Sequence, residues 1–201
     1  MRTKAASVGN VSHTASVLCV LGLVLLTLSW ATARADTQAW AALARPGHVA
    51  LMRHALAPGF GDPPEFTLGD CATQRNLSAE GREQARRIGA ALRDRGVVLD
   101  AVYSSEWCRC LETAEQLGMG PVEPLPSLNS FFSDRAQEQP RTAATLDFLR
   151  RRADRGPMML VTHQVNISAL TGAGTNSGEI VVAAIEQDRL RLVGRITVVP
   201  D

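Results

Sequence analysis

The chain has 201 residues, of which 45% are hydrophobic and 20% charged, and its formal net charge is +1. This length suits one ordinary domain with a sizeable core, and this composition excludes a wholly disordered chain. The charge near zero gives no reason to expect a nucleic acid as a partner.

The first 35 residues have the layout of a secretory signal peptide. Arg2 and Lys4 give a positive start, residues 15–31 are mostly apolar, and Ala33-Arg34-Ala35 forms an A-x-A cleavage site. A retained membrane anchor is the rival interpretation, but the apolar run is short for a span. We therefore expect cleavage after Ala35, a periplasmic or secreted protein, and no stable membrane anchor after cleavage.

Helical periodicity and short apolar runs alternate along residues 36–201. Ser78 is a good N-cap for the clearest helix, and Pro140 suits a first helical turn. Segments 55–70 and 124–139 are expected to be long loops, the first because it is rich in Gly and Pro. The expected helices are 37–44, 79–95, 106–117 and 142–152, and the expected strands are 48–53, 97–104, a short one near 122, 158–162, 179–185 and 190–199.

The order of these elements predicts the fold class. The chain contains no internal repeat and no linker, so residues 36–201 are expected to form one domain. Because strands alternate with helices, we expect a three-layer α/β/α sandwich with a mostly parallel central sheet.

Polar side chains follow three of the expected strands. Arg53-His54 ends the first, Ser104-Ser105 ends the second just before a helix that contains Arg109, and His163 follows strand 158–162. The carboxyl ends of parallel strands meet at one edge of a sheet, so these side chains are expected to converge. Two cations and two imidazoles in one cleft repel each other unless a dianion neutralises them, and a phosphoryl group does so.

These stretches resemble the histidine phosphatase superfamily, also called phosphoglycerate mutase-like or histidine acid phosphatases. The family's Arg-His-Gly signature is similar to Arg53-His54-Ala55, and its Ser-Ser, Arg and Thr-Ala segment resembles Ser104-Ser105 with Arg109 and Thr113-Ala114. Its late histidine corresponds to His163. Residues 76–81 with Gln84-Ala85 resemble a further recurring segment.

The resemblance implies an exported phosphoric monoester hydrolase with a phosphoglycerate mutase-like fold. His54 would be the nucleophile that forms a phosphohistidine, and Arg53, Arg109 and His163 would bind the phosphate and stabilise the charge in transfer. Guanidinium groups then supply the positive charge, so no metal and no other cofactor is expected. The expected partner is a small phosphorylated substrate, and export favours an envelope sugar phosphate.

The acid that protonates the leaving oxygen is not identified by the sequence. Many family members carry a glutamate after the third strand, but the counterpart region here, residues 128–132, reads Leu-Asn-Ser-Phe-Phe. Asp62, Glu65 or Asp134 could substitute from the flanking loops. Two other functions stay open: a phosphate-binding member without turnover, and a phosphohistidine-protein phosphatase.

Three cysteines follow the expected cleavage site. Export permits disulfides, so we expect Cys71 to pair with either Cys108 or Cys110. Cys108 and Cys110 are two residues apart on an expected helix and face different sides, which disfavours a bridge between them. Their spacing is not a standard zinc motif. His48, at the start of a strand, is expected to be structural.

Overall fold

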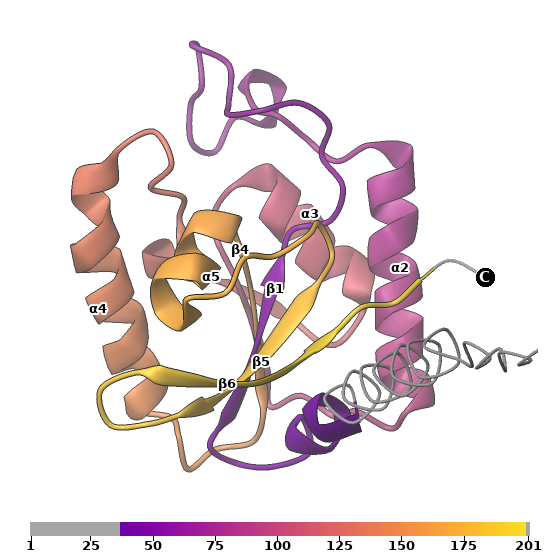
Figure 1. Ribbon diagram of the computed structural model, residues 1–201. Coiled ribbons are helices and arrows are strands. Elements are labelled where there is room, and N and C mark those ends of the chain that lie inside the picture. The colour runs from indigo at the N-terminus through magenta and orange to yellow at the C-terminus, as the bar shows by residue number, and fades with distance from the viewer. Residues whose placement is uncertain (1–36, 200–201) are drawn as a thin grey trace, which may run out of the picture. The chain divides into compact units, whose positions relative to one another are not determined.

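A computed structural model describes residues 37–199, which lie in one compact unit of the chain (Figure 1). The predicted signal peptide lies outside these residues. A six-stranded sheet forms the centre, in the order β3-β2-β4-β1-β5-β6. The strands are β1 His48–Arg53, β2 Ala101–Ser104, β3 Val122–Pro124, β4 Met158–Thr162, β5 Ile180–Ile185 and β6 Leu190–Ile196.

The sheet is mostly parallel, as predicted. β4 lies between β1 and β2 and is parallel to both, and β3 is parallel to β2. β5 is antiparallel to β1, and β6 is antiparallel to β5, so β5 alone opposes the direction of the other strands of this sheet.

Helices cover both faces of the sheet, which confirms the three-layer α/β/α prediction. Successive strand residues point to opposite faces. Ala50 and Met52 of β1 belong to the core shared with α2 and α3, whereas Val49 and Leu51 belong to the core shared with α4 and α5. The helices are α2 Ala79–Asp94, α3 Cys108–Leu117, α4 Glu138–Arg150 and α5 Gln164–Thr171, with short 3₁₀ helices η1 Cys71–Thr73, η2 Pro126–Leu128 and η3 Arg135–Gln137. Residues 37–42 are also helical, within the predicted range 37–44.

The structure differs from the sequence prediction in a few elements. Helix α5 was not predicted, because its eight residues include β-branched and small polar side chains and are too short to establish a periodicity. Helix α3 begins at Cys108 instead of Glu106, since Trp107 keeps an extended backbone as its N-cap. The predicted loop 124–139 contains the short 3₁₀ helices η2 and η3, whereas η1 follows the predicted loop 55–70.

Helix α2 approaches two backbone segments very closely. Ser78 caps it as predicted, accepting a hydrogen bond from the N–H of Gly81. A Cβ atom at Gly81 would overlap the carbonyl oxygen of Leu56, and one at Gly89 would overlap that of Leu117. Glycine is therefore required at both positions for this packing.

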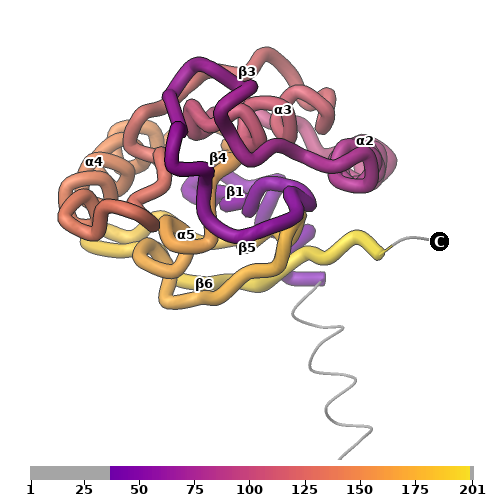
Figure 2. Tube along the Cα trace, turned by 90° about the horizontal axis from the view of Figure 1, so that it is seen from above, coloured from indigo at the N-terminus to yellow at the C-terminus, as the bar shows by residue number. Residues whose placement is uncertain are grey.

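The carboxyl ends of β1, β4 and β2 lie next to each other at one edge of the sheet. Arg53 pairs with Thr162, and Ser104 pairs with Val161. Figure 2, viewed from above, shows the loop after β1 and the loop after β3 on this side of the domain. Within residues 37–199, no helix is long and apolar enough to cross a membrane.

Candidate active site

The four residues singled out in the sequence lie around the edge formed by β1, β4 and β2. His54 follows β1 and His163 follows β4, and their ring centroids are 5.6 Å apart. Arg109, in the first turn of α3, approaches His163 with 3.4 Å between its Nη2 and Nδ1. Arg53 ends β1, where its Nη1 donates to the carbonyl of Thr175 at 2.8 Å. The predicted convergence of these side chains is therefore present.

His54 is held as a neutral imidazole with one free nitrogen. Its Nδ1 lies 2.8 Å from the carbonyl oxygen of Ala55, and a carbonyl only accepts, so Nδ1 carries the hydrogen and Nε2 the lone pair. Burial, which is the largest cause, and the charges of three arginines together lower the pKa of His54 to about 3, against the opposing effect of that hydrogen bond. The side chain is 3% exposed. At neutral pH, Nε2 is available as a nucleophile.

A chain of hydrogen bonds fixes His163. Its Nδ1 accepts from Arg109, so its Nε2 carries the hydrogen and donates to the hydroxyl of Ser105 at 2.9 Å. That hydroxyl donates to Oδ1 of Asn129 at 3.2 Å, and the backbone N–H of Glu106 donates to the same oxygen at 2.8 Å. Burial, together with the charge of Arg109, lowers the pKa of His163 well below its usual value.

The guanidinium of Arg109 is shared with a loop carboxylate. Asp62 accepts from Nη1 at 2.5 Å and from Nη2 at 3.1 Å, and it also accepts from the indole N–H of Trp107 at 3.1 Å. Burial alone would raise the pKa of Asp62, but its hydrogen bonds and the charge of Arg109 outweigh burial and lower this pKa. Asp62 is therefore an ionised partner of Arg109.

The site keeps unused hydrogen-bond donors. Among the described residues, Nε of Arg53 and Nε of Arg109 are buried and have no hydrogen-bond partner. A buried donor without a partner is costly, and an anion with several acceptor oxygens can satisfy both groups.

A third arginine, Arg75, adds to the positive charge. It is half-buried and donates through Nε to the carbonyl of Gly61 at 2.7 Å, and its charge lowers the pKa of both His54 and His163. Arg53, Arg75 and Arg109 against Asp62 give three minus one, a charge of +2 with both imidazoles neutral. A phosphomonoester dianion cancels this charge. Arg75 was not singled out in the sequence analysis, although it directly precedes residues 76–81, which resemble a recurring segment of the family. That position was the indication in the sequence that Arg75 could belong to the site.

Comparison with known proteins agrees with this geometry. Residues 49–139 match the family model of the histidine phosphatase superfamily, branch 1. This match places residues 49–139, which contain Arg53, His54 and Arg109, in the histidine phosphatase superfamily. The resemblance predicted from the sequence is thereby confirmed. No curated protein sequence matches the chain.

Solved structures of histidine phosphatases and mutases share the fold. The chain is similar to a phosphoglycerate mutase from Thermus thermophilus, with 22% identity, a TM-score of 0.54, and 75% of this chain and 99% of that chain covered. The chain is also similar to an alpha-ribazole phosphatase from Shigella flexneri, with 18% identity, a TM-score of 0.53, and 73% of this chain and 96% of that chain covered. The protein histidine phosphatase SixA, complexed with tungstate, is similar with 16% identity, a TM-score of 0.53, and 75% of this chain and 96% of that chain covered. At these identities the likeness concerns the fold.

The three carboxylates considered as the general acid lie in different surroundings. Asp62 lies in the site but is ion-paired with Arg109. Glu65 and Asp134 are exposed on their loops, and Asp134 caps η3 by accepting from the N–H of Ala136. Glu106, which the sequence analysis did not single out, joins the site's network by accepting from Nδ2 of Asn129 at 2.6 Å.

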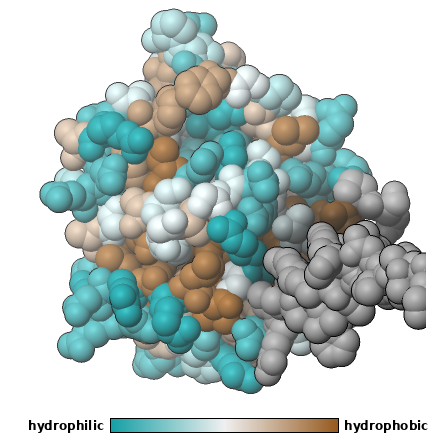
Figure 3. Space-filling view, viewed as in Figure 1, coloured by the Kyte–Doolittle hydropathy of each residue, from teal (hydrophilic) through white to brown (hydrophobic). Residues whose placement is uncertain are grey.

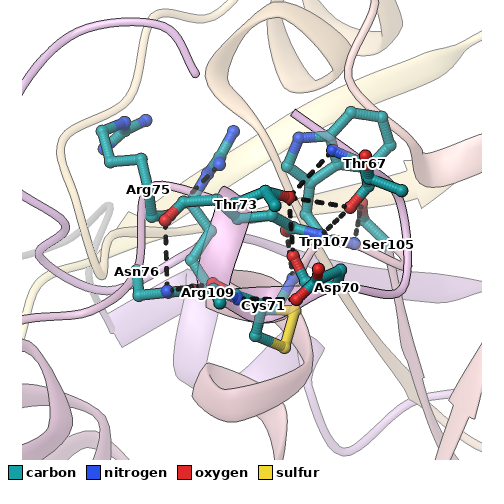
Figure 4. The surroundings of a disulfide bond; sticks show 12 residues. Thr67, Asp70, Cys71, Thr73, Arg75, Asn76, Ser105, Trp107 and Arg109 are labelled. Atoms are coloured by element: carbon teal, nitrogen blue, oxygen red, sulfur yellow. Dashed lines mark hydrogen bonds between the residues drawn. A yellow bond between two sulfur atoms is a disulfide. The ribbon is translucent and has the colours of Figure 1, made fainter. Parts of the chain in front are cut away.

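The cysteine pairing left open by the sequence is settled as Cys71–Cys108. The bond joins η1 to the start of α3, directly before Arg109, and Figure 4 shows Ser105, Trp107 and Arg109 around it. Cys110 is a buried free thiol, with its Sγ 3.5 Å from Nε2 of His163. Burial raises the pKa of Cys110 to about 12, so it is not a thiolate nucleophile.

Other site predictions concern metals and His48. Within the described residues, no three or more His, Cys, Asp or Glu side chains are grouped so that they could hold a metal ion. His48 lies at the start of β1, with its Nδ1 3.1 Å from the carbonyl of Pro46, at the opposite end of that strand from His54.

Proposed function

We propose that this protein is an exported phosphatase that hydrolyses small phosphomonoesters through a phosphohistidine on His54. The observation that carries the proposal is the neutral His54, with Nε2 free, beside a group of three arginines whose surroundings leave a charge of +2. Phosphatases among the solved structures with this fold support the reaction class. Export rests on the predicted signal peptide.

In the first step, Arg53 and Arg109 bind the non-bridging oxygens of the phosphoryl group, and His163, whose single N–H donates to Ser105, accepts from Arg109 and positions it. The donors of the two arginines neutralise the dianion and stabilise the charge that develops in transfer. The lone pair on Nε2 of His54 forms a bond to phosphorus, while the bond from phosphorus to the ester oxygen breaks and its electrons leave with that oxygen.

In the second step, water attacks the phosphohistidine. The bond between phosphorus and Nε2 breaks, the lone pair returns to His54, and inorganic phosphate and a proton are released. The hydrogen bond from Nδ1 to Ala55 holds the imidazole in the same tautomer before and after the reaction. His54 is thereby returned to its neutral starting form.

A second candidate is a phosphohistidine-protein phosphatase. It is favoured by the ion pair of Asp62 with Arg109, which keeps this carboxylate from acting as a proton donor. A phosphoramidate can leave as an imidazole and so depends less on a carboxylic acid than an alkyl ester does. Among phosphomonoesters, an envelope sugar phosphate remains the substrate suggested by export.

The test is turnover of para-nitrophenyl phosphate, phosphohistidine and a sugar phosphate without added metal. We expect turnover of para-nitrophenyl phosphate and, after rapid quenching with a radiolabelled ester, an acid-labile, base-stable label on His54. His54→Ala should abolish turnover yet retain phosphate binding, because the arginines and His163 remain. His48→Ala is the matched control and should be fully active.

Two results would contradict the proposal. One is the absence of turnover with every ester while inorganic phosphate still binds, which identifies a non-catalytic phosphate-binding protein. The other is a label that maps to a residue other than His54. Phosphohistidine turnover far above that of every ester would favour the second candidate.

A further inference from the structure

Large apolar side chains are exposed on the two loops that carry site residues. Within the described part of the chain, seven large hydrophobic side chains are exposed, and four of them lie in the loops after β1 and β3. These four are Leu56, Phe60, Leu68 and Phe132. Phe60 is 87% exposed, which leaves almost its whole ring in water. Such clustering near a polar site is typical of a surface that binds a ligand.

Three of these side chains lie close to the phosphate-binding residues along the chain. Leu56 is two residues after His54, Phe60 is two residues before Asp62, and Phe132 is three residues after Asn129. Because successive Cα atoms are 3.8 Å apart, the Cα of Phe60 lies within about 8 Å of that of Asp62. Asp62 in turn binds Arg109 directly.

The rings of Phe60 and Phe132 bring the two loops together. Their centroids are 4.9 Å apart and their planes cross at 88°, an edge-to-face contact. This contact covers little of Phe60, and Phe132 is still 43% exposed. Figure 3 shows hydrophobic side chains at the surface near the top, where Figure 1 draws the loop between β1 and α2. We call Phe60 and Phe132 the apolar patch.

We propose that the apolar patch binds the leaving group of the substrate, and that this group is apolar and, by preference, aromatic. The inference rests on the proposed phosphatase function and narrows its substrate class. The phosphoryl group is taken by the arginines, and the part of the ester beyond the phosphate then contacts the patch. Covering the exposed rings of Phe60 and Phe132 with an apolar group removes apolar surface from water, which a sugar does much less.

The state of the carboxylates supports an aromatic leaving group in particular. Asp62 is ion-paired with Arg109, Glu106 accepts a hydrogen bond from Asn129, and Glu65 and Asp134 are exposed on their loops. A phenolate leaves phosphorus without much help from an acid, whereas an alkoxide needs a proton. The apolar patch and the ion-paired Asp62 therefore point to the same class of ester.

Binding of phosphonates tests the inference without the influence of leaving-group reactivity, because their carbon–phosphorus bond is not hydrolysed. The inhibition or dissociation constants of naphthylphosphonate, decylphosphonate and methylphosphonate are measured for the full protein. We expect naphthylphosphonate to bind at least about tenfold more tightly than methylphosphonate, with decylphosphonate between them. Phe60→Ala and Phe132→Ala should each weaken naphthylphosphonate about three- to tenfold, the usual effect of one aromatic contact, and leave methylphosphonate unchanged.

Val98→Ala is the matched control, since Val98 is 79% exposed but precedes the amino end of β2, whereas the site lies at the carboxyl ends of the strands. It should change none of the constants. Equal binding of naphthylphosphonate and methylphosphonate, or equal effects of Phe60→Ala on both, would overturn the inference. So would a dimer that dissociates on Phe60→Ala without any change in phosphonate binding, because the patch would then be an interface between copies.

The test separates this inference from the proposed function. Failure of the inference leaves turnover of para-nitrophenyl phosphate intact, with no preference among phosphonates. Failure of the proposed function instead removes turnover, while the preference for naphthylphosphonate stays measurable as binding.

Discussion

The Cys71–Cys108 disulfide is predicted to contribute about 4 kcal/mol to the free energy of unfolding. Its cysteines are 37 residues apart in the sequence. In the chain-entropy treatment, closing a loop of this length removes about 13 cal/mol/K from the unfolded chain, which is about 4 kcal/mol at 25 °C. For a domain of this size, that change corresponds to roughly 8–16 °C in the melting temperature.

The assay is urea unfolding of the oxidised protein, with and without reductant. The double variant Cys71→Ser and Cys108→Ser should lose the same free energy as the reduced wild-type protein. It should then be insensitive to reductant. Cys110→Ala is the control, because Cys110 is outside the bond and its variant should keep the full response to reductant.

The reasoning is refuted if reductant changes the free energy of unfolding of the wild-type protein by less than about 1 kcal/mol, since the loop length sets a larger value. It is also refuted if the response to reductant disappears in Cys110→Ala. The second result would mean that Cys110, and not Cys108, is the partner of Cys71.

Three further predictions concern the site and the N-terminus. Asp62→Asn should lower the melting temperature, because the guanidinium of Arg109, which is 3% exposed, loses its ionised partner. Inorganic phosphate should raise the melting temperature of this variant more than that of the wild type. Equal effects of phosphate on both proteins in thermal melts would contradict this prediction. The pKa of His54 is about 3 in the folded protein and about 6.5 in the unfolded chain, so between these values only the unfolded chain binds the proton. The free energy of unfolding should therefore decrease as the pH is lowered below 6.5, by about 2 kcal/mol between pH 6.5 and pH 5. His54→Asn should reduce that loss in urea titrations, and an unchanged acid dependence would count against a neutral buried imidazole. The intact mass of the exported protein should correspond to cleavage between Ala35 and Asp36, and a mass that begins at Met1 would exclude it.

The sequence identified the parts of the site that depend on local patterns. Arg53, His54, Arg109 and His163 each stand at the end of an apolar strand or at the start of a helix that follows one, and such boundaries can be recognised from neighbouring residues. Since the sheet is mostly parallel, these boundaries lie at one edge, and the prediction of convergence followed from the fold class alone.

The sequence did not identify the contacts made between loops. Nothing local indicates that Asp62 would accept two hydrogen bonds from Arg109, because that contact depends on the path of an irregular loop. The link between Asn129 and Ser105 likewise joins residues 24 positions apart. Helical spacing separated Cys108 from Cys110 but did not show which of them faces η1, and only the packing of α3 decides this.

Helix α2 fixes the distance between the segment that follows His54 and the helix that contains Arg109. Gly81 contacts the carbonyl of Leu56, two residues beyond His54, and Gly89 contacts that of Leu117, at the end of the helix that contains Arg109. The two glycines are about 12 Å apart along the helix axis. One inserted residue between them would shift one contact by about 1.5 Å and rotate it by about 100°. Insertions in α2 should therefore impair phosphate binding as well as core packing. Insertions in the loop before α2 do not change the distance between these two contacts.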